Sequence, residues 1–137
     1  RDDALIRAGH NVRIDEDCSF VSGEWVGPYT GATLTDSSDV DIDHIVPLAN
    51  AWRSGASAWS TADREAYAND PGVLLSTDDG ANQEKGDKGP EAWKPPNEDY
   101  WCEYSRRWIS IKSTWGFSVN RAEKAALNEM LGTCGAG

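Results

Sequence analysis

The sequence predicts an α+β fold, in which short strands and a strand–turn–strand–helix core are followed by C-terminal helices. Residues 39–44 alternate between acidic and aliphatic side chains, which is the period of a half-buried strand. Residues 97–115 instead place apolar side chains at the spacing of one helix face. At 137 residues the chain suits one small domain over residues 1–137, and no apolar run is long enough to cross a bilayer.

The N-terminal part is expected to form short strands joined by turns, because brief apolar runs alternate there with Gly, Asn and Pro. The expected strands lie at 5–6, 12–14, 18–21 and 33–35, with turns at 9–11 and 27–31, a break at Gly23 and a loop at 36–39. The chain begins at Arg1 rather than Met, so we expect residues 1–17 to be an N-terminal extension that is processed or truncated upstream.

Capping residues predict where the later helices begin and end. Pro suits the first turn of a helix, Ser, Thr and Asn suit its N-cap, and Gly suits its end. On this basis the expected elements are a strand at 39–44, helices at 47–54 and 60–69, a turn at 70–72, a strand at 73–75, and helices at 79–86, 97–115 and 120–131.

The charge is acidic and unevenly distributed. The chain has 13 basic and 23 acidic residues, a net charge of −10. Residues 1–84 hold 5 basic and 16 acidic residues, whereas residues 85–137 hold 8 and 7. The total argues against long-range attraction to phosphates, so any surface that binds anions should use the second part of the chain.

Seven Trp residues are many for a chain of this length, and their large apolar area helps a small domain to build a core. A platform for base stacking is the alternative use of such residues. We expect six of them to lie in the core: Trp52, Trp59, Trp93, Trp101, Trp108 and Trp115.

The three cysteines, Cys18, Cys102 and Cys134, form no CxxC pair, which argues against a structural zinc site. Cys102 and Cys134 both fall in the C-terminal helical region and could form a disulfide there. Cys18 would then need a partner outside this sequence, and three buried thiols are the alternative. We favour the disulfide and a secreted, oxidising setting.

Two segments, 41–48 and 82–88, carry the residues of a candidate active site. Asp43 and His44 are neighbours at a strand end, so one can bind a metal ion while the other faces a substrate, and Asn82 can supply a further oxygen ligand. Oxygen ligands without Cys suit a hard cation such as Mg²⁺, beside which an imidazole can act as general base for water. These parts suffice for phosphodiester hydrolysis, although each residue could equally serve as a structural hydrogen bonder, turn former or helix cap.

The sequence Asp41–Ile–Asp–His–Ile–Val–Pro–Leu48, followed by Asn82–Gln–Glu–Lys–Gly–Asp87, resembles the HNH endonucleases of the ββα-metal superfamily. It is most similar to the secreted HNH-type nucleases of Gram-positive bacteria, and the similarity extends from about Cys18 to Cys134. Further matching segments lie at 23–25, 28–31, 51–56, 68–70, 91–96 and 100–104. The resemblance implies a ββα-metal core within the α+β fold, and a Cys upstream that pairs with Cys18.

The resemblance also implies a role for individual residues. Asp43 and Asn82 would bind one divalent metal ion, for which Mg²⁺ is favoured and Mn²⁺ or Ca²⁺ are alternatives. His44 would be the general base that activates the attacking water. Val73 stands where many members of the family have an Asn that orients this base, and Asn69 is the nearest residue that could take that role.

We therefore expect a secreted, metal-dependent endonuclease that hydrolyses phosphodiester bonds of DNA, or of RNA, with low sequence specificity. Lys85 and Lys88 flank the site and are expected to contact substrate phosphates. We expect a monomer that binds nucleic acid and no membrane. The alternatives are an interbacterial toxin or restriction-type nuclease domain, and a non-catalytic Trp-rich module that binds cell walls or carbohydrate.

Overall fold

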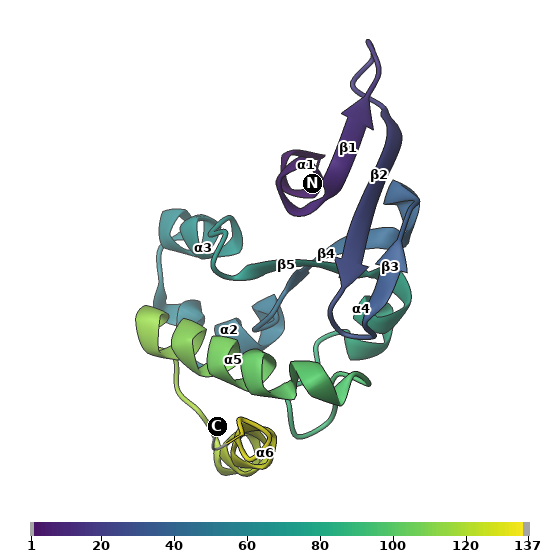
Figure 1. Cartoon of the computed structure of the whole chain (residues 1–137). Coiled ribbons are helices and arrows are strands. Elements are labelled where there is room, and N and C mark those ends of the chain that lie inside the picture. Colours follow the sequence, from purple (N-terminus) through teal and green to yellow (C-terminus); the bar gives the residue numbers. More distant parts are fainter. Residues whose placement is uncertain (1, 136–137) are drawn as a thin grey trace.

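The computed structural model, which describes residues 2–135, has two antiparallel sheets and six helices among those residues, and it confirms the α+β class (Figure 1). The elements are α1 (Asp2–Ala8), β1 (His10–Ile14), β2 (Phe20–Gly27), β3 (Ala32–Leu34), β4 (Val40–His44), α2 (Leu48–Arg53), α3 (Thr61–Ala68), β5 (Leu74–Asp78), α4 (Asp79–Lys85), α5 (Trp101–Trp115) and α6 (Arg121–Leu131). Short 3₁₀ turns lie at Ser37–Asp39, Ala56–Ala58 and Glu98–Tyr100. No helix of the described part is long and apolar enough to span a membrane.

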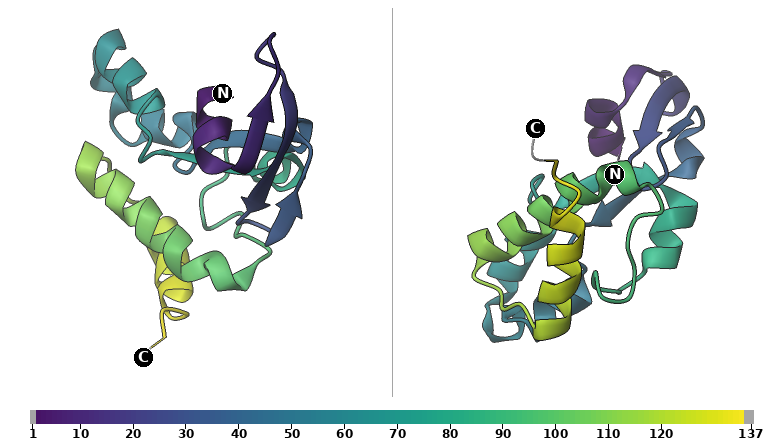
Figure 2. Two further views of the ribbon diagram at one scale, coloured as in Figure 1. Left: turned by 45° about the horizontal axis from the view of Figure 1, so that its top comes forward. Right: turned by 60° about the horizontal axis from the view of Figure 1, so that its bottom comes forward.

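The first sheet has the order β1–β2–β3, and its β1–β2 hairpin projects from the rest of the molecule (Figures 1 and 2). A small apolar cluster lies beneath this sheet and consists of Leu5 from α1, Trp25 from β2 and Val40 from β4. The Trp25 indole N–H donates to the Leu5 carbonyl at 2.9 Å, so the same ring holds α1 against β2.

The second sheet is the β4–β5 hairpin, whose register pairs Asp43 with Leu75 and His44 with Leu74. Because side chains alternate along a strand, Ile42 and His44 lie on one face of β4, and Asp43 lies on the other. α4 follows β5 directly and packs on the hairpin, which completes the strand–strand–helix unit.

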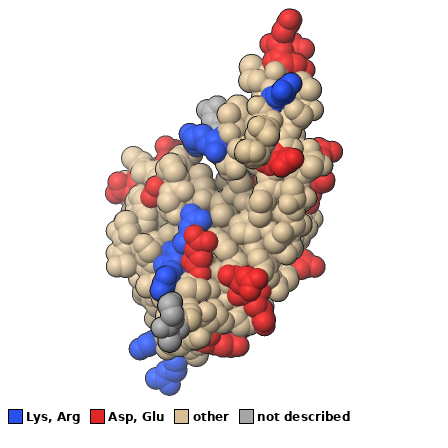
Figure 3. All heavy atoms as spheres, viewed as in Figure 1, with Lys and Arg blue, Asp and Glu red and all other residues tan. Residues whose placement is uncertain are grey.

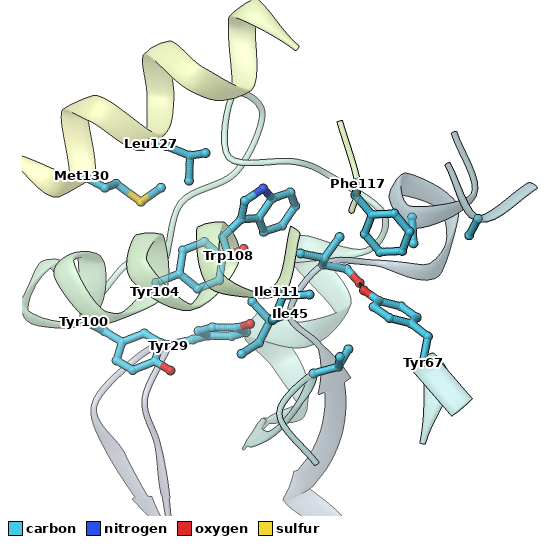
Figure 4. Packing of buried hydrophobic residues seen from close by; sticks show 14 of the residues in the cluster. Tyr29, Ile45, Tyr67, Tyr100, Tyr104, Trp108, Ile111, Phe117, Leu127 and Met130 are labelled. Carbon is cyan, nitrogen blue, oxygen red and sulfur yellow. Dashed lines mark hydrogen bonds between the residues drawn. The ribbon is translucent and has the colours of Figure 1, made fainter. Parts of the chain in front are cut away.

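Aromatic side chains fill the main core, which brings together residues from α3, α5, α6 and the segments after β2 and β4 (Figure 4). Tyr104 and Trp108 of α5 are fully buried at its centre. The Tyr29 ring lies edge-on to Tyr104 at 5.6 Å between centroids. From α3, the Tyr67 hydroxyl donates to the Val46 carbonyl at 2.8 Å, so the segment after β4 is fixed to α3.

α5 and α6 are joined by a buried ion pair and by a disulfide. The Lys112 ammonium lies 2.8 Å from the Glu123 carboxylate, which also accepts from the Trp108 indole N–H at 3.2 Å. Cys102 and Cys134 form the expected disulfide across a sequence separation of 32 residues. Cys18 is exposed and forms no disulfide among residues 2–135.

Most predicted elements are confirmed with small shifts of their ends, but the N-terminal part differs. Residues 5–6 belong to helix α1 instead of a strand, and the helix buries Leu5 against Trp25 and Val40 while Ile6 is exposed. Gly23 does not end a strand, since β2 continues through it to Gly27. A Cβ at Gly23 would lie 2.7 Å from the Trp25 ring, so the glycine makes room for that ring.

Two further differences concern β5 and one Trp. β5 begins at Leu74 and extends to Asp78, three residues beyond the predicted end at 75. Trp108 is buried and four other Trp residues of the expected set pack against the core, but Trp52 of α2 is 51% exposed. The prediction that Trp52 lies in the core is therefore wrong.

Removing the disulfide should destabilise the fold. Replacing Cys102 and Cys134 together with Ser opens a closed loop of 32 residues, so we expect the free energy of unfolding to fall by roughly 3–4 kcal/mol. Denaturant titration measures this difference. Cys18→Ser is the control and should change stability by less than about 0.5 kcal/mol, because the residue is exposed. Equal midpoints for the double variant and the wild type would contradict the prediction.

Candidate active site

The face between β4 and α4 collects four polar side chains. Asp41 and Asp43 are two residues apart on β4 and therefore share the face toward α4. Asn82 and Lys85 are three residues apart on α4 and share one helix face. The Asn82 amide donates to the Asp41 carboxylate at 3.1 Å, and the Lys85 ammonium lies 3.1 Å from the Asp43 carboxylate. Strand alternation and helix spacing thus bring both predicted metal-binding residues to one interface.

The Asp43 carboxylate is buried and held by two donors. Asp43 is 7% exposed. The Tyr29 hydroxyl donates to its carboxylate at 2.5 Å, and Lys85 lies fully buried beside that carboxylate. Burial raises the pKa of the Asp43 carboxyl, and the Lys85 charge and the Tyr29 hydrogen bond oppose that rise. Burial likewise lowers the pKa of the Lys85 ammonium, and the Asp43 charge opposes that fall. Tyr29 was not singled out from the sequence, because its contact with Asp43 depends on tertiary packing.

His44 is the last residue of β4 and is half-buried. Its Nε2 lies 2.9 Å from the carbonyl oxygen of Ala68 at the end of α3. A carbonyl oxygen only accepts, so this contact places the ring proton on Nε2 and leaves the lone pair of a neutral imidazole on Nδ1. That tautomer suits a general base. The His44 main-chain carbonyl in turn accepts from Lys85 at 3.1 Å, which fixes the end of β4 to α4.

The structure does not bring the Asn69 side chain to His44. Asn69 caps the end of α3, and its exposed amide donates to the Glu65 carbonyl at 2.9 Å. The group that contacts the imidazole is the main-chain carbonyl of the preceding residue, Ala68. Every residue type carries such a carbonyl, so no side-chain pattern in the sequence identifies it.

The two predicted phosphate-binding lysines lie in different surroundings. Lys85 is fully buried and its ammonium contacts Asp43 and the His44 carbonyl, a placement that argues against direct phosphate contact. Lys88 is exposed just beyond α4, where its ammonium donates to the Glu84 carbonyl at 2.7 Å. Of the two, Lys88 alone presents its charge to solvent.

The β4–α4 face offers ligands that fit a hard divalent cation. Two carboxylates and one amide lie there, and such oxygens suit Mg²⁺ or Mn²⁺ with water completing the coordination. The Asn82 amide donates through its nitrogen to Asp41, which leaves its own oxygen as an acceptor. No three His, Cys, Asp or Glu side chains converge within the described residues, so a metal site here depends on the amide oxygen and on water.

A groove of about 480 Å³ lies alongside β5, between α1 and β2 on one side and α5 on the other, where Figure 3 shows the surface hollowed. Ile42 and Leu74 line it, and both flank His44 on its own face of the hairpin. Arg7 and Arg107 also line it, and the Arg107 guanidinium donates to the Leu74 carbonyl at 3.3 Å. The groove therefore combines two cations and the Glu103 carboxylate with the strand face to which His44 also belongs.

Residues 13–130 match the family described as GmrSD restriction endonucleases, C-terminal domain. A protein of Arthroderma benhamiae, named "Uncharacterized secreted protein", is 54% identical over 136 residues, which are 98% of this chain and 67% of that protein. No solved structure matches the chain. Because this relative is fungal, it gives no support to the narrower similarity with nucleases of Gram-positive bacteria.

Lys85→Met should destabilise the protein by about 3–5 kcal/mol at pH 8, because it leaves the buried Asp43 carboxylate without its counter-ion. Denaturant titration measures the loss. Lys88→Met is the matched control from the same segment and should change stability by less than about 0.5 kcal/mol. Equal losses for the two variants would contradict the assigned ion pair.

The loss in Lys85→Met should shrink at lower pH. Burial already raises the pKa of the Asp43 carboxyl, and the variant lacks the charge that opposes the rise. The folded variant then binds a proton at a pH where the unfolded chain, with a carboxyl pKa of about 4, does not. Its free energy of unfolding should therefore fall as pH rises above about 4, so the deficit against wild type is smaller at pH 5 than at pH 8. A deficit that grows toward pH 5 would contradict this.

Proposed function

We propose a function for this chain from one premise: the chain belongs to the family of the GmrSD restriction endonuclease C-terminal domains. Family membership supports a nuclease, and the name of the secreted relative, together with the disulfide, supports a secreted protein. We infer that it is a metal-dependent, HNH-type endonuclease that hydrolyses phosphodiester bonds of DNA, or of RNA. The observation that carries this proposal is the contact of His44 Nε2 with the Ala68 carbonyl, since it leaves Nδ1 free to accept a proton.

His44 would act as the general base. A water molecule placed between Nδ1 and the scissile phosphate would lose a proton to Nδ1 as its oxygen attacks phosphorus, and the bond from phosphorus to the leaving sugar oxygen would break. The imidazolium that forms keeps its Nε2–H bond to the Ala68 carbonyl, so the ring does not have to turn during the reaction. General-base action of this kind contributes roughly 10²- to 10⁴-fold in rate.

Asp43 and Asn82 would hold one divalent metal ion, with Mg²⁺ favoured, and Asp41, which accepts from the Asn82 amide, could supply a further oxygen ligand. A metal ion bound there would stabilise the charge that develops on the phosphate oxygens and on the leaving group. In the described structure Lys85 supplies positive charge to Asp43, so this ammonium has to share the carboxylate with the metal ion or shift from it.

Substrate binding would use the groove beside β5. Arg7 and Arg107 line it and can contact phosphates, which position a strand without specifying its sequence. Lys88 can add a further contact from the end of α4. The net charge of −10 opposes long-range attraction of nucleic acid, so binding should be weak and sensitive to salt.

A restriction-type nuclease domain is the second candidate, and the description of the family favours it. The same residues would serve it, with a companion domain supplying recognition of the target. A Trp-rich binding module has less support, because Trp108 is buried and four more Trp residues pack against the core.

The central test is plasmid nicking by His44→Ala. We expect the variant to cleave roughly 10²- to 10⁴-fold more slowly than wild type in Mg²⁺, because it lacks the base. A chelator should abolish cleavage by the wild type. His10→Ala is the control, since His10 is the other histidine of the chain and lies exposed on β1. Equal rates for His44→Ala and His10→Ala would remove His44 from the mechanism.

The metal ligands can be tested by calorimetric titration with Mn²⁺. Asn82→Ala and Asp43→Asn should each weaken binding by at least about 10-fold, because each removes an oxygen ligand. Asp39→Asn is the control, because Asp39 is exposed in the 3₁₀ turn before β4. Unchanged affinity in Asn82→Ala would place the metal ion elsewhere.

A further inference from the structure

Trp52 is the Trp that the sequence assigned to the core and the structure leaves 51% exposed. It lies on α2 and lines a cavity of about 260 Å³ between α2 and α3. The wall of this cavity is largely apolar and includes Leu48, Ala51, Trp52, Ala56, Tyr67 and Ala68. An indole with half of its surface open to water, at the mouth of an apolar cavity, is suited to bind a flat apolar surface.

The cavity adjoins the candidate general base. Ala68 is part of its wall, and the carbonyl of the same residue accepts the His44 Nε2–H. Tyr67, the preceding wall residue, is hydrogen bonded to the Val46 carbonyl two residues after His44. A ligand that fills the cavity would therefore lie one residue from the imidazole, on the side of its Nε2.

Arg64 of α3 holds the ring of Trp52 in place. Its guanidinium carbon lies 4.9 Å from the centre of the Trp52 ring, and its Nη1 donates to the Ala56 carbonyl at 3.4 Å. The contact orients the indole before any ligand binds and puts a positive charge beside the cavity. Glu65 adds a negative charge to the same wall, so a ligand with an anionic group would approach on the Arg64 side.

The cavity is smaller than the roughly 300–1,000 Å³ of pockets that take drug-sized ligands. It therefore suits one planar ring system and is too small for a helix or a strand of another protein. A nucleobase has such a ring system, and its own phosphate can meet the nearby guanidinium.

We propose that the α2–α3 cavity binds one unpaired nucleobase of the substrate, on the Nε2 side of His44, with Trp52 as the stacking surface. This inference rests on the proposed nuclease function and deepens it. A base inside a duplex is stacked on both sides and cannot enter the cavity, so the preferred substrate is single-stranded or locally unpaired nucleic acid. Stacking on an aromatic ring accepts all four bases, which agrees with low sequence specificity.

The test compares binding of a fluorescein-labelled single-stranded oligonucleotide to wild-type protein and variants, by anisotropy in the presence of a chelator so that no strand is cut. Trp52→Ala should raise Kd by about 5- to 100-fold, the span expected for loss of one base–aromatic stack. Trp52→Phe should restore most of the affinity because it keeps a stacking ring. Ile109→Ala is the matched control, since Ile109 is also an exposed apolar residue on a helix and lies on α5 away from the cavity.

An oligonucleotide series with one abasic site at successive positions identifies the base that enters the cavity. At one position the missing base should weaken binding to the wild type as much as Trp52→Ala does, and Trp52→Ala should then have no further effect. If Trp52→Ala raises the Kd by the same factor with every abasic oligonucleotide, the proposal is overturned. Equal Kd values for Trp52→Ala and Ile109→Ala would also overturn it. Thermal unfolding of each variant shows whether a loss of binding reflects a loss of fold.

The outcomes separate this inference from the function on which it rests. Wild-type protein that cuts nucleic acid while Trp52→Ala binds and cuts equally well would overturn the cavity proposal alone. Wild-type protein that neither binds nor cuts any oligonucleotide would overturn both. A preference of the wild type for duplex over single strands would also count against the cavity, whatever the rate of cleavage.

Discussion

The Asp43 carboxylate is buried, since only 7% of the residue is exposed, and the surrounding fold supplies its hydrogen-bond and ion-pair partners. Lys85 reaches it from α4, and Tyr29 reaches it from the turn after β2. A buried charge without partners would cost several kcal/mol, so the hairpin, α4 and the turn after β2 have to keep their relative positions. Lys85 also bonds the His44 carbonyl, and one ammonium therefore fixes the two adjacent residues on which the proposed chemistry depends.

The aromatic core supports this contact from the other side. Tyr29 lies edge-on to Trp93, Tyr100 and Tyr104, so the ring that donates to Asp43 is itself locked by its neighbours. Tyr104 belongs to α5 and Tyr100 to the 3₁₀ turn directly before it, and the disulfide and the Lys112–Glu123 pair hold α6 on α5. The C-terminal helices thus act on the site indirectly, by keeping the Tyr29 hydroxyl where Asp43 needs it.

Those parts of the fold that depend on local patterns could be predicted from the sequence. β4 follows from strict alternation, and α3, α4 and α6 follow from capping residues at their ends. α1 could not be recognised, because a seven-residue helix is too short to show a clear period. The sequence motif singled out Asp43, His44 and Asn82 as candidate site residues. The contacts around these residues could not be predicted, because Tyr29 and Lys85 approach from distant segments and Ala68 contributes a main-chain atom. The exposure of Trp52 was likewise unpredictable, since composition does not say which face of a six-residue helix is covered.

The alternation of side chains along β4 also explains how one short hairpin can present the proposed metal ligand on one face and the proposed base on the other. Asp43 and His44 are adjacent, so their side chains leave β4 on opposite faces. The Asp43 face is closed by α4 and is suited to hold a cation away from bulk water, whereas the His44 face continues into the groove lined by Ile42 and Leu74. A phosphate can be reached from both faces only where the strand ends, and His44 is the last residue of β4. At that same point α3 supplies the Ala68 carbonyl and part of the wall of the Trp52 cavity, so the proposed metal ligands, the proposed base and the proposed stacking surface are all connected through the end of one strand.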